Sequence, residues 1–129
     1  MLKIYLSGPI SCPRTPEGWK YNFQQAIDAQ VTLMNRGFAV FNPMLTMALG
    51  GGCEPNPCDI THEAFIENDL AWVECADAVL RLPGESVGAE IECDHARRWG
   101  IPVYDSIADL EDDCFGECEE PFDETDLPL

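Results

Sequence analysis

Residues 77–92 read DAVLRLPGESVGAEIE, and this stretch decides the fold class. Four of its first six residues are apolar, which predicts a short buried strand. Pro83, Gly84, Glu85 and Ser86 are residues typical of a tight turn. A helix is predicted to follow as far as about Trp99, where the next glycine ends it. A strand that leads through a tight turn into a helix is the repeating unit of parallel α/β sheets.

The same unit recurs on both sides of this stretch. Strands are predicted at residues 2–6, 38–41 and 101–104, and helices are predicted at about 15–36 and 61–75. Thr15 and Pro16 suit the first two positions of the earlier helix, and Gly37 suits its end. This alternating order with short connections predicts an α/β fold. We expect a doubly wound, flavodoxin- or Rossmann-like parallel sheet of four to five strands, with helices on both faces.

Apolar residues at helical spacing predict which side of each helix faces the sheet. For the first helix they are Trp19, Phe23, Ile27, Val31 and Met34. For the second helix they are Phe65, Ile66, Leu70 and Val73.

Charge and length limit the classes of function. The chain has 129 residues, 24 acidic against 7 basic side chains and a formal net charge of −17. This balance argues against binding to nucleic acid and against docking on an anionic membrane surface. There is no apolar run of the roughly 20 residues that span a membrane. Residues 1–10 do not resemble a secretory signal, so we expect a cytoplasmic protein.

The chain divides into two parts. Residues 1–110 are predicted to form the domain, and residues 111–129 are an acidic tail with nine acids and no base. A short helix is predicted near residues 106–112, and a loop at residues 46–59 is long enough to act as a flap. The seven cysteines are an odd number, so free thiols are expected in a reducing compartment.

Two loops rich in Gly, Ser and Pro are predicted to form the site. In doubly wound sheets, ligands bind beyond the carboxyl ends of the strands where the strand order reverses. The first loop supplies Ser7, Gly8, Pro9 and Ile10, and the second supplies Ser86 and Gly88 as candidate substrate-binding residues. The second loop leads into a helix, whose free N–H groups favour an anion.

Three side chains are candidates for the chemistry. Glu90 and Glu92 are two residues apart on a helix, so they point roughly 200° apart and only one can face the site. Asp69, late in the second helix, and Tyr5, near the end of the first strand, are placed to approach the same crevice. A tyrosine, two carboxylates and an anion-binding loop suit attack on a sugar carbon, with one carboxylate as nucleophile and the other handling the proton of the leaving group.

The order of several motifs resembles the nucleoside 2-deoxyribosyltransferase-like superfamily. The motifs are KIYLSGPI at residues 3–10, GFAVFNP at 37–43, NDLAW at 68–72, ADAV at 76–79 and SVGAEIE at 86–92. The resemblance covers residues 2–104. It is strongest to small, phage-type members and to the 2'-deoxynucleoside 5'-phosphate N-hydrolases.

The resemblance implies cleavage of the N-glycosidic bond of a 2'-deoxynucleoside 5'-monophosphate or nucleoside, with water or another base as acceptor. Glu92 matches the catalytic nucleophile, Tyr5 a tyrosine that orients it, and Asp69 an aspartate that helps to protonate the departing base. Ser86 matches a serine that accepts the 5'-phosphate in the N-hydrolases, where the nucleoside transferases carry an aspartate. The resemblance also implies a homodimer or larger homo-oligomer, and the site calls for no metal or organic cofactor.

Three other interpretations stay open. In the first, the protein binds or sequesters a nucleotide without turning it over. In the second, it acts as an acidic interaction protein through its tail. Cys53, Cys58 and His62 resemble part of a zinc ligand set, which Cys114 and Cys118 would complete.

Overall fold

A computed structural model describes residues 1–10, 15–45 and 60–115 of the chain. Within these residues, strands and helices alternate as the sequence predicts. In order they are β1 (Lys3–Ser7), α1 (Pro16–Asn35), β2 (Ala39–Phe41), α2 (His62–Val73), β3 (Ala78–Arg81), α3 (Val87–Arg98), β4 (Val103–Tyr104) and α4 (Ile107–Phe115).

The four strands form one parallel sheet in the order β2-β1-β3-β4. The chain goes from β1 to β2 on one side and then to β3 on the other, so the strand order reverses at β1. The register places Tyr5 beside Phe41 on β2, and it places Ser7 beside Arg81 on β3. The predicted doubly wound α/β fold is confirmed, with four strands in the part of the chain that the structure describes.

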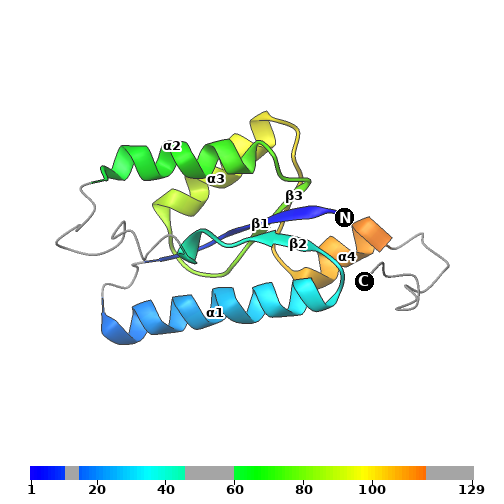
Figure 1. The fold of residues 1–129 in the computed structure, drawn as a ribbon, viewed down its shortest axis with the longest axis horizontal. Coiled ribbons are helices and arrows are strands. Elements are labelled where there is room, and N and C mark those ends of the chain that lie inside the picture. Colours follow the sequence, from blue (N-terminus) through cyan, green and yellow to red (C-terminus); the bar gives the residue numbers. More distant parts are fainter. Residues whose placement is uncertain (11–14, 46–59, 116–129) are drawn as a thin grey trace.

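Helices cover both faces of this sheet. Figure 1 shows α2 and α3 on one face and α1 and α4 on the other. Because successive strand side chains point to opposite faces, β1 serves both layers. Ile4 and Leu6 belong to the core that includes α1 and α4, whereas Tyr5 belongs to the core beneath α2 and α3. Ser7, two residues after Tyr5, therefore also faces α3.

The predicted inward face of α1 is wrong by about one residue position. The helix buries mainly small residues, namely Gly18, Asn22, Ala26, Ala29 and Leu33. Val31 and Met34, which were predicted to face inward, are more than half exposed. Trp19 and Phe23 are half-buried and stack on each other with ring centroids 5.6 Å apart. Small side chains let the helix axis approach the sheet closely, and a pattern weighted by large apolar residues does not detect that contact.

The ends of α1 follow the sequence prediction. The Thr15 hydroxyl accepts a hydrogen bond from the Gly18 N–H at 3.0 Å, and Pro16 is the first helical residue. Gly37 adopts a φ of +91°, a conformation that favours glycine and ends the helix.

The other helices agree with the prediction in part. Of the predicted inward residues of α2, only Val73 is buried, and Phe65, Ile66 and Leu70 are half-buried. The helix predicted near residues 106–112 extends to Phe115 as α4. The predicted flap at residues 46–59 lies outside the described residues, as does the tail from residue 116 onward. Among the helices described, none is long and apolar enough to cross a membrane.

Candidate active site

The two predicted loops lie against each other at the carboxyl ends of β1 and β3. The Leu82 N–H donates to the Ser7 carbonyl oxygen at 2.7 Å. A Cβ atom added at Gly8 would lie 2.8 Å from the Cβ of Leu82, so this position has room only for glycine. Gly84 has a φ of +120°, and a Cβ there would lie 2.7 Å from the ring of Pro9. Close packing between the loops therefore explains Gly8 and Gly84.

Side chains of α1 hold both loops from below. The Asn22 side-chain amide donates to the Ile10 carbonyl oxygen at 3.2 Å, and the Gln25 amide donates to the Pro83 carbonyl oxygen at 3.2 Å. Backbone carbonyls of both loops are thus bound by the same helix.

Ser86 is the N-cap of α3. Its hydroxyl oxygen accepts a hydrogen bond from the Ala89 N–H at 3.0 Å. Capping uses a lone pair of this oxygen, so the hydroxyl hydrogen is not consumed by it. Gly88 stands in more open space, because an added Cβ there would meet only the Ser86 hydroxyl at 3.9 Å. The start of α3 combines a serine hydroxyl with N–H groups that lack helical partners by geometry.

Glu92 occupies the centre of the site. Its side chain is only 8% exposed, whereas Glu90 is 65% exposed, as their angular separation on the helix predicts. The Tyr5 hydroxyl donates to Glu92 Oε2, and the Ser7 hydroxyl donates to Glu92 Oε1 at 3.0 Å. Both donors come from β1 and neither is exposed. Each oxygen of the carboxylate is therefore oriented by its own hydroxyl group.

Burial dominates the electrostatics of Glu92. It raises the pKa of this carboxyl from 4.5 to about 7, and repulsion from Asp69 acts in the same direction. The hydrogen bonds from Tyr5 and Ser7 and the positive charge of Arg81 oppose the rise. The pKa of Tyr5 is raised by its own burial and by the neighbouring carboxylates, so its hydroxyl stays protonated and remains a donor.

Asp69 lies on the facing side of α2 as the second carboxylate of the site. Burial raises its pKa from 3.8 to about 6, partly offset by a hydrogen bond with Asn68. Its Oδ1 atom is buried and has no hydrogen-bond partner among the described residues. The structure thus brings Asp69 and Glu92 close to Tyr5, although they follow it in the sequence by 64 and 87 residues.

A column of stacked rings supports Tyr5. Its ring stacks on Phe41 with centroids 5.6 Å apart, and Phe41 stacks on Trp72 with centroids 5.0 Å apart. Trp72 is three residues after Asp69 on α2 and is about half exposed. The column joins β1, β2 and α2, so it fixes both the orienting hydroxyl and the helix that carries the second carboxylate.

Sequence analysis missed two contributions. Ser7 was predicted to bind substrate, and its side chain is instead fully buried against Glu92. Arg81 ends β3 directly beside Ser7 and acts on the charge of Glu92, yet it was not a candidate. Its place as the last residue of a strand at the carboxyl edge was the signal that could have identified it.

The described residues contain no group of three or more metal-ligating side chains. Cys53, Cys58 and Cys118 lie outside that part of the chain. The chemistry that the described site offers comes from carboxylates, hydroxyls and one guanidinium. A buried carboxylate held in this way can act as a nucleophile or a base.

Fold and site together define a doubly wound α/β protein with a buried and a half-buried carboxylate, Glu92 and Asp69, at the strand-order reversal. Residues 2–105 match the model of a family described as a domain of unknown function, DUF4406, and the chain belongs to this family. No curated protein sequence matches the chain.

Among solved structures, the chain is similar to a 2-deoxyribosyltransferase from the psychrotolerant bacterium Bacillus psychrosaccharolyticus. The TM-score is 0.57 and the sequence identity is 22%, over 81% of this chain and 75% of that one. Likeness at this level of identity shows a shared fold.

Proposed function

We propose that this protein cleaves the N-glycosidic bond of a 2'-deoxynucleoside 5'-monophosphate or nucleoside, with Glu92 as the nucleophile. One observation carries the proposal. A buried glutamate at the carboxyl edge of a doubly wound sheet accepts hydrogen bonds from two buried hydroxyls and lies near a second, partly buried carboxylate. The shared fold with a 2-deoxyribosyltransferase and the motif resemblance support the same chemistry.

In the first step, an oxygen of Glu92 attacks C1' of the sugar. A C1'–O bond forms as the C1'–N bond breaks, and the electron pair of the broken bond goes to the base nitrogen. Asp69 supplies the proton that neutralises the departing base. Its buried Oδ1 has no partner among the described residues, which supports this assignment.

This step needs Glu92 ionised and Asp69 protonated. With pKa values near 7 and 6, the two carboxyls together hold about one proton at a pH between these values. Moving that proton from Glu92 to Asp69 costs about 1.4 kcal/mol for each pH unit between the two pKa values. The pKa of about 7 already includes the hydrogen bonds from Tyr5 and Ser7, which stabilise the negative charge on Glu92, and without them this cost would be larger.

In the second step, the ionised Asp69 takes a proton from water, and the water oxygen attacks C1'. The bond to Glu92 breaks with its electron pair returning to the carboxylate, and the free sugar or sugar phosphate leaves. A second base that attacks C1' instead of water gives transfer rather than hydrolysis. The same two carboxylates serve both outcomes.

The start of α3 supports a 5'-phosphate on the substrate. The Ser86 hydroxyl can donate to a phosphate oxygen while its lone pair caps the helix, and the first N–H groups of the helix favour an anion. An aspartate at position 86 would repel the phosphate. Gly8, Pro9, Ile10 and Gly88 complete the proposed binding loops through their backbones. Assembly as a homo-oligomer and a cytoplasmic location are further parts of the proposal, and both come from the sequence.

Chromatography of the protein mixed with the four 2'-deoxynucleoside 5'-monophosphates, and separately with the four deoxynucleosides, tests the proposal. We expect free base from at least one monophosphate, and we expect Ser86→Asp to weaken the use of monophosphates relative to nucleosides. A ligand that stays bound without release of base would contradict catalysis and favour the binding-protein alternative. If the unmodified protein uses nucleosides better than monophosphates, the phosphate assignment is wrong and the transferase assignment gains.

A further inference from the structure

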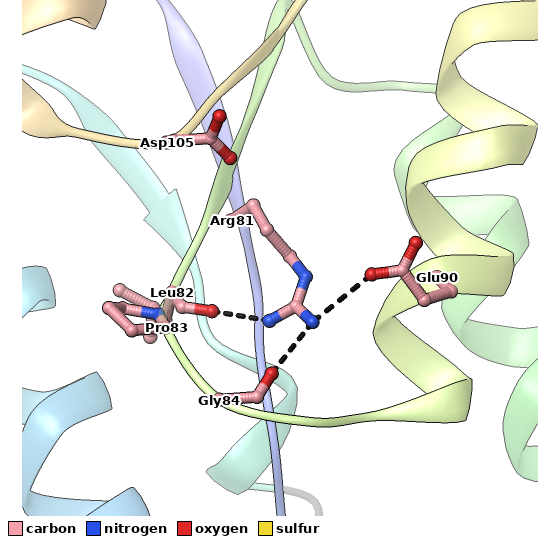
Figure 2. Close-up of a pocket in the computed structure, with 6 residues that line it drawn as sticks. All are labelled: Arg81, Leu82, Pro83, Gly84, Glu90 and Asp105. Atoms are coloured by element: carbon pink, nitrogen blue, oxygen red, sulfur yellow. Dashed lines mark hydrogen bonds and ion pairs between the residues drawn. The ribbon is translucent and has the colours of Figure 1, made fainter.

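A cavity of about 330 Å³ lies beside the carboxylate pair, at the carboxyl ends of β3 and β4. Its lining residues are Arg81, Leu82, Pro83, Gly84, Glu90 and Asp105 (Figure 2). The lining does not include Glu92, Tyr5 or Asp69, so the cavity is separate from the proposed catalytic residues. The two places are adjacent because Arg81 pairs with Ser7 in the sheet and Ser7 binds Glu92.

The loop between β3 and α3 holds the Arg81 guanidinium in a fixed place. One terminal nitrogen donates to the Leu82 carbonyl oxygen, and the other donates to the Gly84 carbonyl oxygen at 2.8 Å. The side chain is only 13% exposed. Figure 2 shows the loop curving around the guanidinium, with Glu90 approaching from α3. The positive charge is therefore already oriented before any ligand arrives.

Glu90 is the weakly held partner of this charge. Its Oε1 lies 3.2 Å from the Arg81 terminal nitrogen, and its side chain is 65% exposed. An ion pair with an exposed partner contributes little stability, so Glu90 can leave at small cost. A phosphate monoester carries up to two negative charges and three acceptor oxygens, and it pairs strongly with a guanidinium.

We propose that the Arg81 cavity binds the phosphate group of the substrate, and that this phosphate replaces the Glu90 carboxylate on Arg81. This inference rests on the proposed function, because it names the group that recognises the 5'-phosphate of that substrate. Arg81 and Ser86 are at opposite ends of one short loop, so a cation and a hydroxyl donor flank the same turn.

The replacement makes the cavity selective. Glu90 pairs with the guanidinium and Asp105 adds a second carboxylate to the lining, so a ligand that leaves Glu90 in place meets a net negative surface. A phosphate that displaces Glu90 gains the arginine and moves one carboxylate into solvent. A neutral nucleoside gains nothing from the exchange. Arg81 and Glu90 therefore act on the choice between monophosphates and nucleosides.

Calorimetric titration of the full chain with inorganic phosphate tests the exchange directly. We expect Glu90→Gln to tighten the Kd for phosphate by roughly fivefold, because the competing partner is removed. Asp105→Asn removes one charge from the same cavity without breaking the pair, and we expect a smaller gain in phosphate affinity than from Glu90→Gln. Arg81→Gln should weaken phosphate binding at least tenfold, with thermal unfolding as a check on its folding.

An unchanged or weaker affinity for phosphate in Glu90→Gln would overturn the proposal, and this variant needs no change in the loop. Equal tightening of phosphate binding by Glu90→Gln and Asp105→Asn would also overturn it, because the loss of any negative charge from the lining would then explain both results. Phosphate binding is measured without turnover, so failure of base release counts against the proposed reaction and leaves the cavity result standing. If both hold, Glu90→Gln lowers KM for a monophosphate about fivefold and leaves KM for the nucleoside unchanged.

Discussion

The burial of Glu92 predicts that its replacement by glutamine stabilises the protein at alkaline pH. The pKa of the carboxyl rises from 4.5 to about 7 on folding, so the folded state binds the proton more tightly than the unfolded state does. The stabilisation from protonated Glu92 is complete below pH 4.5 and is lost as the pH rises through about 7. At 1.36 kcal/mol for each pH unit, the full loss is about 3 kcal/mol.

Glutamine has no charge to bury, so it escapes this loss. Its amide oxygen still accepts one hydroxyl hydrogen bond, and Ser7 can turn toward the Ala89 carbonyl oxygen 3.5 Å away. We expect the difference in free energy of unfolding between Glu92→Gln and the unmodified protein to grow in favour of the variant by about 2 kcal/mol from pH 5 to pH 8.

Urea unfolding at a series of pH values measures this difference. Subtracting the free energy of unfolding of the unmodified protein at each pH cancels the contributions of the other acids, which both proteins share. Glu67→Gln is the matched control, because Glu67 is an exposed acid on α2 and lacks the burial that drives the effect. Glu90 is unsuitable as a control, since it pairs with Arg81. A difference for Glu92→Gln that does not change with pH would refute the reasoning, because it would mean that burial of this carboxylate costs nothing.

The other predictions concern the neighbours of Glu92 and the tail. Ser7→Ala and Tyr5→Phe each remove a hydrogen bond that lowers the pKa of Glu92. Because Glu92 has the higher pKa of the two carboxyls, the alkaline limb of the kcat/KM profile should move to higher pH with a loss of roughly tenfold; an unmoved alkaline limb would contradict their orienting role. Asp69→Asn should slow base release by roughly 10²- to 10⁴-fold, and the loss should shrink for a purine whose N7 methylation makes protonation unnecessary; an equal loss on both substrates would remove Asp69 from the proton step. Removing residues 116–129 takes away six of the 24 acids and should lower KM for a monophosphate at low salt with little change in kcat; a KM that climbs steeply with salt in the intact protein would contradict this view of its field.

Local signals in the sequence predicted most of the fold. Thr15, Pro16 and Gly37 mark the ends of α1 by rules that involve only neighbouring residues, and the structure confirms them. The angular separation of Glu90 and Glu92 on one helix predicts that one is buried and the other exposed, which the structure also shows. Such predictions succeed because helix geometry is the same in every protein.

Contacts between distant segments could not be predicted in the same way. The inward face of α1 depends on how closely it approaches the sheet, and small residues such as Ala26 and Ala29 make that approach. Ser7 looked like a loop residue that would meet substrate, but the register of β1 directs its hydroxyl to Glu92. The position and pairing of the Arg81 side chain depend on Glu90 on the next helix and on the loop that wraps around it. These properties depend on tertiary packing, which no local pattern encodes.

Mass spectrometry of the intact protein after a rapid acid quench tests the central proposal most directly. During turnover of a 2'-deoxynucleoside 5'-monophosphate, Glu92 as nucleophile predicts an adduct of one 2-deoxyribosyl 5-phosphate group, located by proteolysis on the peptide that contains Glu92. The adduct should be absent in Glu92→Ala, whose turnover falls by about 10³-fold or more. An adduct on another residue, or base release by Glu92→Ala at the rate of the unmodified protein, would contradict Glu92 as the nucleophile.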